Sequence, residues 1–215
     1  MKFRKISMII LFVFCLVQAF CQELLIGSKK LNDGNVPEYK FSVYTPWLTF
    51  SNFGNEKTNT QHYELTFRYN LTEKDKVGIK VATWKLFAPM GIPLWNPLFL
   101  KERAFFPGRL RETGVGATYQ RTIWKGLYAT VEVLPLFKTY LDEEKNKVGK
   151  GFKLYTSYHL GYHVPLFKGR CYIEPQIHVN YWPIDTNTPA AFKETEAGWN
   201  NYFLFEPNLY LGVNF

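Results

Sequence analysis

The last sixteen residues of the chain, Asn200–Phe215, alternate apolar and polar side chains and end on a phenylalanine. Successive side chains of a β-strand point to opposite sides of the sheet, so this segment is a strand with one apolar face and one mostly polar face. A strand of a soluble sandwich has the same pattern, but an aromatic carboxy-terminus on the apolar face favours a transmembrane β-barrel. The apolar face carries Phe203, Phe205, Pro207, Leu209, Leu211, Val213 and Phe215, and the other face carries Tyr202, Leu204, Glu206, Asn208, Tyr210, Gly212 and Asn214.

The amino terminus has the pattern of a secretory signal peptide. Basic residues at positions 2, 4 and 5 precede an apolar run, Met8–Val17, that is too short to span a bilayer as a helix. Ala19 and Cys21 place small side chains before Gln22, so we expect Sec export and cleavage by signal peptidase in front of Gln22. Lipidation of Cys21 is a second interpretation, which the larger residues before it disfavour.

The domain organisation follows from this cleavage. We expect a signal peptide at 1–21, an N-terminal periplasmic segment at 22–38 and an outer-membrane β-barrel at 39–215. Removing 1–21 takes away three basic residues and no acidic residue, so the formal net charge falls from +8 to +5. The remaining basic residues are mixed with acidic ones, which gives nucleic-acid binding little support and suits loops that face anionic lipopolysaccharide. One cysteine, Cys171, remains after cleavage, so no disulfide forms within the mature chain.

Eight segments of the mature chain alternate well enough to be strands. After the signal peptide no apolar run is long enough for a membrane helix, yet aromatic residues make up 18% of the chain. A barrel strand needs only about ten residues, with every second one apolar, so a mean hydropathy of −0.20 is compatible with membrane insertion. The expected strands are Phe41–Phe50, Gln61–Leu71, Lys76–Phe87, Arg109–Arg121, Leu127–Tyr140, Gly151–Val164, Arg170–Pro183 and the terminal Asn200–Phe215.

The facing of the first expected strand is ambiguous, because two sets of residues compete for the lipid side. One set is Tyr44, Pro46, Leu48 and Phe50, and the other is Val43, Thr45 and Trp47. In the other strands the apolar set is clearer.

The expected connections alternate between short and long. Short breaks follow the second, fourth and sixth strands, at 72–75, 122–126 and 165–169, and longer ones lie at 51–60, 88–108, 141–150 and 184–199. Outer-membrane barrels have short periplasmic turns and long outer loops, so we predict an all-β, antiparallel up-and-down barrel of eight strands. Ten strands stay possible if 93–106 or 24–39 pairs with the sheet.

The signal peptide, the alternating strands and the terminal sequence Tyr210-Leu211-Gly212-Val213-Asn214-Phe215 resemble the small outer-membrane β-barrel proteins of Gram-negative bacteria. This resemblance implies contact with outer-membrane lipid and insertion by the barrel-assembly machinery, which reads the terminal strand in that family. It thereby gives Tyr210, Gly212, Val213 and Phe215 the role of an assembly signal. The resemblance implies no activity.

Several titratable residues fall on the inward faces of the expected strands. An eight-stranded barrel is just wide enough for its own side chains, so the main interpretation is a lumen filled by ion pairs and hydrogen bonds. A narrow polar path for a small solute, in a porin-like channel or carrier, is the alternative. A bulge beside Pro175 or Pro207 would re-aim the inward glutamate that precedes it. The inward residues are Glu64, Arg68, Lys80, Glu132, His159, His163, Glu174, His178 and Glu206.

A lipid-modifying enzyme is the third functional class. Ser157 and His159 share a strand face and Glu174 lies across the next turn, so a serine-histidine-acid set is conceivable. Their inward facing argues against it, and ordinary lumen polarity is the simpler interpretation. His159 and His163 lie about 13 Å apart along a strand, too far to share a metal ion, and we expect no metal and no cofactor.

The second long connection is unusually apolar for a solvated loop. Trp95, Phe99, Phe105 and Phe106 are its candidate interaction residues, either packed on the barrel rim or bound to an extracellular partner that the sequence leaves unknown. The sequence as a whole predicts an outer-membrane barrel with a structural or surface-interaction role.

Overall fold

The described residues form a closed antiparallel β-barrel of eight strands, which confirms the predicted fold class. The structure is a computed structural model that describes residues 39–50, 52, 58–90, 92, 97 and 104–215. The expected signal peptide and periplasmic segment therefore lie outside the described residues. The strands are β1 (Phe41–Pro46), β2 (Tyr63–Asn70), β3 (Asp75–Leu86), β4 (Arg109–Trp124), β5 (Leu127–Leu141), β6 (Lys147–Tyr162), β7 (Val164–Leu166), β8 (Cys171–Thr186) and β9 (Tyr202–Asn214).

The ring closes because β1 pairs with both the next strand and the last one. Val43 lies opposite Phe67 of β2 and opposite Val213 of β9. The ring then runs β1-β2-β3-β4-β5-β6-β8-β9, and short β7 extends the line of β6 beyond His163 while it pairs with β8. Full closure removes most exposed sheet edges, which is the condition for a sheet to cross a bilayer.

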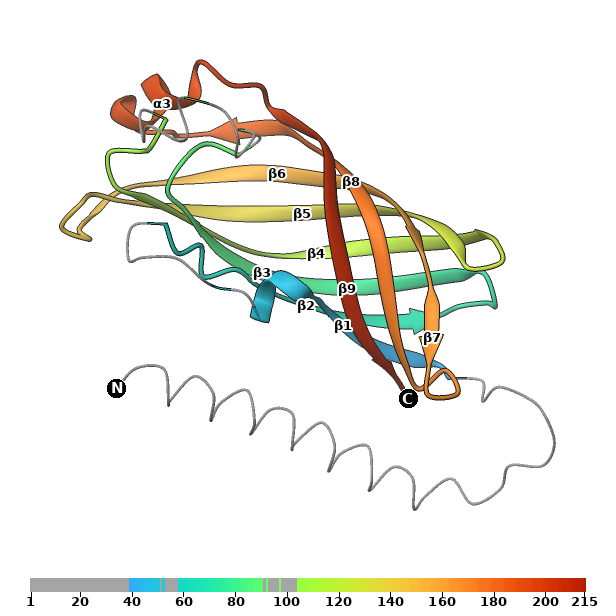
Figure 1. The fold of residues 1–215 in the computed structure, drawn as a ribbon. Helices are drawn as coiled ribbons and strands as arrows, with labels where there is room; N and C mark the ends of the chain where they lie inside the picture. The colour runs from blue at the N-terminus through green and yellow to red at the C-terminus, as the bar shows by residue number, and fades with distance from the viewer. Residues whose placement is uncertain (1–38, 51, 53–57, 91, 93–96, 98–103) are drawn as a thin grey trace, which may run out of the picture. The chain divides into compact units, whose positions relative to one another are not determined.

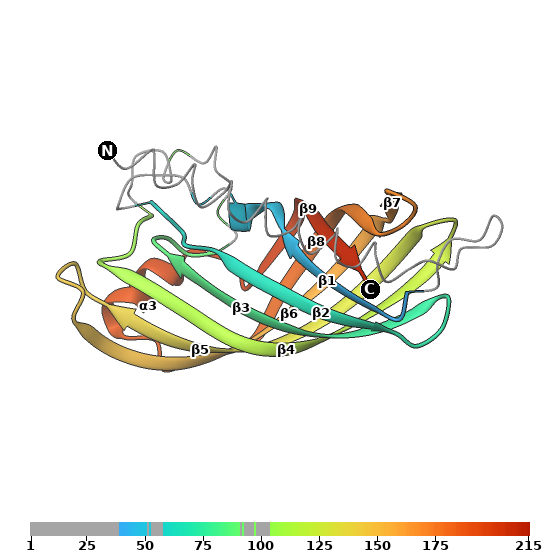
Figure 2. The same ribbon diagram turned by 90° about the horizontal axis from the view of Figure 1, so that it is seen from below.

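The short turns lie at one end of the barrel together with the C-terminus, and the long connections lie at the other (Figure 1). The tightest turn consists of Lys125 and Gly126, both with positive φ, as two-residue hairpins of the primed type require. The loop end also carries helix α3 (Ala190–Glu196) in both views (Figures 1 and 2), and its Phe192 ring lies 4.8 Å from the Tyr140 ring of β5. No helix among the described residues is long and apolar enough to cross a membrane.

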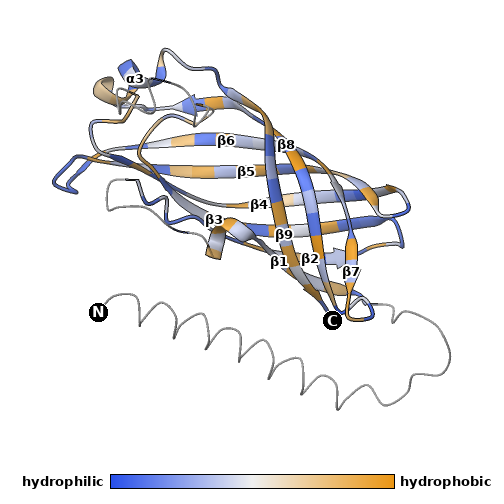
Figure 3. Ribbon diagram, viewed as in Figure 1, coloured by the Kyte–Doolittle hydropathy of each residue, from blue (hydrophilic) through white to orange (hydrophobic). Residues whose placement is uncertain are grey.

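Apolar side chains cover the outside of the barrel and polar ones turn inward. Hydrophobic and hydrophilic residues alternate along the strands (Figure 3), and the outward set is strongly exposed. Ile79 is 60% exposed, whereas the next residue, Lys80, is 2% exposed. This distribution is the reverse of that in a water-soluble protein and suits a barrel surrounded by lipid. The apolar outer side chains are favoured in contact with lipid, and the charged inner side chains are kept away from it. The exposed set includes Leu65, Phe67, Val81, Val115, Val131, Val133, Leu160 and Ile177.

The first strand is shorter than predicted. β1 ends at Pro46, which has no N–H for the ladder, and the chain then forms the 3₁₀ helix η1 (Trp47–Phe50). Its ambiguous facing is now settled, because Ser42, Tyr44 and Pro46 are buried and Val43 faces outward with Thr45. The third long connection is also shorter than predicted, since β6 begins at Lys147.

The terminal strand contains a bulge that its alternation does not predict. His178 pairs with Glu206 but Val179 pairs with Leu204, so Phe205 is an extra residue, and its φ is +61°. The facing inverts there: Leu204 is exposed and Phe203 packs on the internal cluster around Trp84. The prediction that Phe203 lies on the apolar outer face is therefore wrong.

Candidate functional site in the barrel lumen

The structure places all nine predicted lumen residues on the inward side of the barrel wall. Glu64, His163 and Glu206 are partly exposed to the interior, and the other six are buried. A bulge does lie beside Glu206 and Pro207, whereas Glu174 and Pro175 pair in regular register with Tyr210 and Leu209.

An ion pair lies near the short-turn end. Arg68 donates to both carboxylate oxygens of Glu174, at 3.1 Å and 3.3 Å. Its guanidinium also donates to the Tyr172 hydroxyl at 2.7 Å and to Gln120, and it lies 4.4 Å from the centroid of the Tyr44 ring. Both partners are almost fully buried, so the forked geometry and the extra hydrogen bonds are what offset the loss of hydration. We call Arg68 and Glu174 the short-turn-end pair.

The central cluster consists of Lys80, Glu64, Glu132, His62 and Tyr210. The Lys80 ammonium lies 2.9 Å from Glu64 and 2.6 Å from Glu132. It also donates to the Tyr210 hydroxyl at 3.2 Å, and Nε2 of His62 lies 2.7 Å from the second Glu64 oxygen. Strands β2, β3, β5 and β9 are thereby tied together through the lumen, which leaves little room for a continuous water column.

Two imidazole rings are stacked beside the central cluster. The ring centroids of His159 and His178 lie 3.9 Å apart with 9° between their planes, and the nearly parallel Tyr210 ring lies 6.3 Å and 5.9 Å from them. Two imidazolium ions at this distance would repel strongly in a poorly hydrated interior, so at least one ring is neutral. Nδ1 of His159 bonds to Gln176 at 3.1 Å, whereas Nε2 of each ring is buried without a hydrogen-bond partner among the described residues.

A third group, the loop-end cluster, was not selected from the sequence. Lys153 lies 2.6 Å from Glu112, whose other oxygen accepts a 2.7 Å hydrogen bond from the Trp84 indole. Lys138 pairs with Asp185 and donates to Thr188 at 3.1 Å. The alternation of β6 did place Lys153 inward with Tyr155, so a charge count on inward positions would have found part of this cluster.

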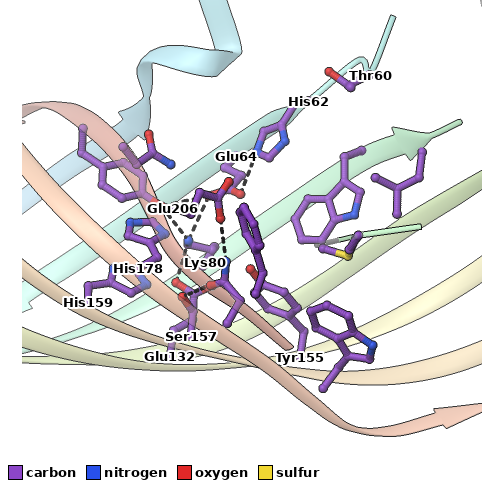
Figure 4. A pocket seen from close by; sticks show the side chains of 18 residues that line it. Thr60, His62, Glu64, Lys80, Glu132, Tyr155, Ser157, His159, His178 and Glu206 are labelled. Atoms are coloured by element: carbon purple, nitrogen blue, oxygen red, sulfur yellow. Dashed lines mark hydrogen bonds and ion pairs between the residues drawn. The ribbon is translucent and has the colours of Figure 1, made fainter. Parts of the chain in front are cut away.

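A cavity of about 200 Å³ lies between the central cluster and the loop end (Figure 4). Its polar side carries Glu64, Lys80, Glu132, Ser157 and Glu206, together with the two stacked imidazoles. Its apolar side is formed by Trp84, Leu86, Met90, Tyr155, Trp182 and Phe203. The short-turn-end pair and the central cluster lie between this cavity and the short-turn end of the barrel.

A second cavity of about 620 Å³ lies at the loop end. It is lined by residues of β6, β8 and the β8–β9 connection, among them Lys153, Asp185 and Glu196. Burial raises the pKa of the Glu196 carboxyl in α3, and the positive charge of Lys153 opposes this shift. The cavity is lined by two acidic residues, Asp185 and Glu196, and two basic residues, Lys153 and Lys193, so its lining has no net formal charge that would favour an anionic or a cationic ligand.

The three catalytic candidates have separate partners. Ser157 donates to Asn180 at 2.5 Å, His159 bonds to Gln176, and Glu174 bonds to Arg68 and to His163 at 2.8 Å. The structure therefore does not bring Ser157, His159 and Glu174 together as a hydrogen-bonded relay. Within the described ranges no three His, Cys, Asp or Glu side chains are placed to hold a metal ion.

The apolar second connection packs in part on the barrel. Phe106 is 5% exposed and lies 5.2 Å from the Phe192 ring of α3, and Phe105 makes an edge contact with Phe87 at 4.9 Å. Trp95 and Phe99 lie outside the described residues. The connection is thus anchored at its end by packing, and Phe192 anchors α3 to the same cluster.

Three of the proposed assembly-signal residues lie in β9, on both of its faces, and Phe215 directly follows the strand. Tyr210 and Gly212 point inward, and Val213 and Phe215 lie on the outer side, where Phe215 is 44% exposed. Gly212 lies against the ring of Tyr172, and a Cβ at this position would meet Tyr172 Cζ at 2.1 Å. Packing inside the barrel therefore favours glycine at this position, independently of any role of the strand as an assembly signal.

Two solved outer-membrane proteins are similar to this chain. A major outer membrane protein from Thermus thermophilus shares 13% identity with a TM-score of 0.49, and the Yersinia pestis outer membrane protein Ail shares 11% with a TM-score of 0.44. Each alignment covers 83% of this chain and 100% of the other. No protein-family model and no curated protein sequence matches the chain. The evidence for the closed ring is the strand pairing within this chain itself.

Proposed function

We propose that this chain is a bacterial outer-membrane barrel with a structural or surface-interaction role and a sealed lumen. The observation that carries the proposal is the stack of three charged groups across the interior: the short-turn-end pair, the central cluster and the loop-end cluster. The first two groups link strands across the ring, and the loop-end cluster links strands that lie two apart in it, by side chains that are largely withdrawn from solvent. A water-filled pore would need these bridges to be absent or displaced.

The outer location is supported by the apolar outer wall and by the predicted signal peptide. The exposed apolar residues would contact membrane lipid, and the mixed charges of the long connections suit the lipopolysaccharide surface. Export by Sec, cleavage before Gln22 and insertion by the barrel-assembly machinery complete the proposal. The proposed signal for insertion is the terminal strand, with Phe215 on its outer face.

A surface role is supported by the order of the loop end. Phe192 of α3 is 2% exposed and packs with Phe106, Leu110 and Tyr140, so the β8–β9 connection holds a fixed position on the rim. Exposed side chains of α3, among them Lys193 and Glu194, are then presented by a rigid support.

Conductance in planar lipid bilayers tests the sealed lumen against the channel alternative. We expect no steps above the background of protein-free bilayers, while a general porin reconstituted in parallel conducts. Ion-conducting steps from the folded protein would refute the sealed lumen and favour the small channel or carrier. For the lipid-modifying enzyme, a mass change of lipid A that is lost in Ser157→Ala would be the supporting result.

A further inference from the structure

Four basic side chains gather on the outer wall of the barrel, at the loop end of β4 and β6. On β4, Arg109 and Arg111 alternate with Leu110 and Glu112, which are fully buried, so the two arginines point outward. On β6, the two basic residues are exposed as well. We call this set the cationic frame, and its members are Arg109, Arg111, Lys147 and Lys150.

Strand β5 runs between the two sides of the cationic frame. Thr139 lies opposite Arg111 on one side and opposite Lys150 on the other. Leu141 occupies the equivalent position between the other two members. Two strand spacings, about 10 Å, separate the members across β5, and two residues along β4 span about 7 Å. Long basic side chains at these positions can therefore converge on one group held over β5.

The described contacts of the two arginines are all with neutral groups. Arg109 donates to the Gly108 carbonyl at 2.7 Å. Arg111 donates to the Thr83 hydroxyl at 3.4 Å and to the side-chain oxygen of Gln61. No member of the cationic frame forms an ion pair with an acidic side chain of the described residues. The four positive charges are therefore not neutralised by that part of the protein.

The acidic residues closest in sequence have other partners or point elsewhere. Asp142 directly follows β5, and its carboxylate accepts from the backbone N–H of Asn146 at 2.8 Å and from its amide at 3.3 Å. Glu112 points into the lumen and pairs there with Lys153 at 2.6 Å. The exposed carboxylates of Glu143 and Glu144 lie further out, in the β5–β6 connection. An anion at the cationic frame would therefore meet no competing carboxylate of these residues.

The short-turn end of the same wall is different. Arg121, an outward arginine near the other end of β4, lies 2.5 Å from Asp75 of β3. The same carboxylate accepts a hydrogen bond from the Tyr119 hydroxyl at 2.6 Å. The outer wall thus has a neutralised arginine at the short-turn end and a cluster of unneutralised cations at the loop end. Such an asymmetry suits a membrane whose outer surface is the more anionic one.

The cationic frame lies at the edge of the apolar band. On β5 the outward residues from Ala129 to Phe137 are all apolar, and Phe137 is 68% exposed directly below Thr139. Phe152 of β6 continues this edge, with its ring 6.1 Å from the Phe137 ring. A barrel strand crosses the hydrocarbon layer in about 9–11 residues, so the next outward positions of β5 and β6 reach the headgroup layer.

We propose that the cationic frame binds the phosphate group of an outer-leaflet lipid whose acyl chains lie against Phe137 and Phe152. A phosphate monoester carries about −1.5 to −2 charges near pH 7, and its oxygens accept the paired N–H groups of arginine and the ammonium groups of lysine. The site favours a lipid over a soluble phosphate ester because the cations adjoin the apolar wall. The inference rests on the proposed function, which places the loop end at the cell surface.

Native mass spectrometry of the folded protein in neutral maltoside micelles tests the site, with diphosphorylated lipid A as the probe. We expect one lipid A per chain to bind more tightly than phosphatidylcholine, whose headgroup has no net charge. Lys147→Gln/Lys150→Gln should weaken lipid A binding about tenfold or more. Lys74→Gln/Lys168→Gln removes two exposed lysines at the short-turn end and is the matched control, which should bind as the unaltered protein.

Folding of each variant is checked by its shift in gel mobility on boiling, and Lys147→Arg/Lys150→Arg should bind because it keeps the charges. The site is overturned if phosphatidylcholine binds as tightly as lipid A, if the two double Gln variants bind equally well, or if the folded Arg variant is as weak as Lys147→Gln/Lys150→Gln. Glucose 1-phosphate, a phosphate monoester without acyl chains, should bind at least about tenfold more weakly than lipid A. Equal binding would assign the site to a soluble phosphate ester and overturn the lipid.

A separate experiment distinguishes failure of the site from failure of the proposed function. In a Cys171→Ser background, Glu143→Cys places a thiol in the exposed β5–β6 connection. A membrane-impermeant maleimide should label this thiol on intact cells. Absence of labelling would contradict the proposed orientation and, with it, a site for outer-leaflet lipid. Labelling together with equal lipid A binding by the two double Gln variants would overturn the site alone.

Discussion

Removal of the buried guanidinium of Arg68 is expected to destabilise the barrel strongly. Arg68→Met keeps most of the side-chain volume but leaves Glu174, Tyr172 and Gln120 without their donor. Breaking one half of a buried ion pair costs about 3–5 kcal/mol. His163 still bonds to Glu174 at 2.8 Å, so we expect about 3 kcal/mol, the lower end of that range.

The double variant Arg68→Met/Glu174→Met separates charge burial from packing. It removes both charges together, so its free energy of unfolding should be closer to that of the unaltered protein than that of Arg68→Met alone. The assay is equilibrium urea unfolding of the protein in lipid vesicles, followed by gel mobility and tryptophan fluorescence. A loss below about 1 kcal/mol for Arg68→Met, or an additive loss in the double variant, would refute the view that this pair is a fully buried bridge.

Three further variants test other parts of the structure. Ile79→Arg puts a charge on the lipid-facing wall and should lower the free energy of unfolding in vesicles by about 2–4 kcal/mol, whereas a change near zero would mean that this face meets water. Gly212→Ala drives a methyl group against the Tyr172 ring and should cost about 1–3 kcal/mol in the same assay; full stability would show that the ring moves freely. Phe192→Ala should leave barrel stability nearly intact but make the β8–β9 connection cleavable by trypsin at Lys193, and unchanged resistance would contradict its role as an anchor.

The strand count and the facing of most strands could be predicted because lipid outside and charge inside impose a period of two on the sequence. That period identifies Val77, Ile79 and Val81 as outward and Lys80 as inward without any structure. The same reasoning failed at Phe203, since the bulge at Phe205 shifts the register by one residue and exchanges the two faces.

The partners of the inward charges could not be predicted. Pairing depends on the stagger between strands, which brings Lys80 of β3 to Glu132 of β5 and Lys153 of β6 to Glu112 of β4. The early end of β1 could not be predicted from the sequence either. Leu48 and Phe50 continue the apolar alternation, although the chain after Pro46 forms a 3₁₀ helix.

The central claim is that the apolar outer face of the barrel contacts membrane lipid. Spin labels on β5 in a Cys171→Ser background test it most directly, with the protein in vesicles and collision with oxygen or with a water-soluble nickel chelate as the measurement. Labels at Val131 and Val133, both more than 40% exposed on the outer wall, are predicted to collide often with oxygen and rarely with the chelate. Frequent collision of these two labels with the chelate would place the wall in water and contradict the account.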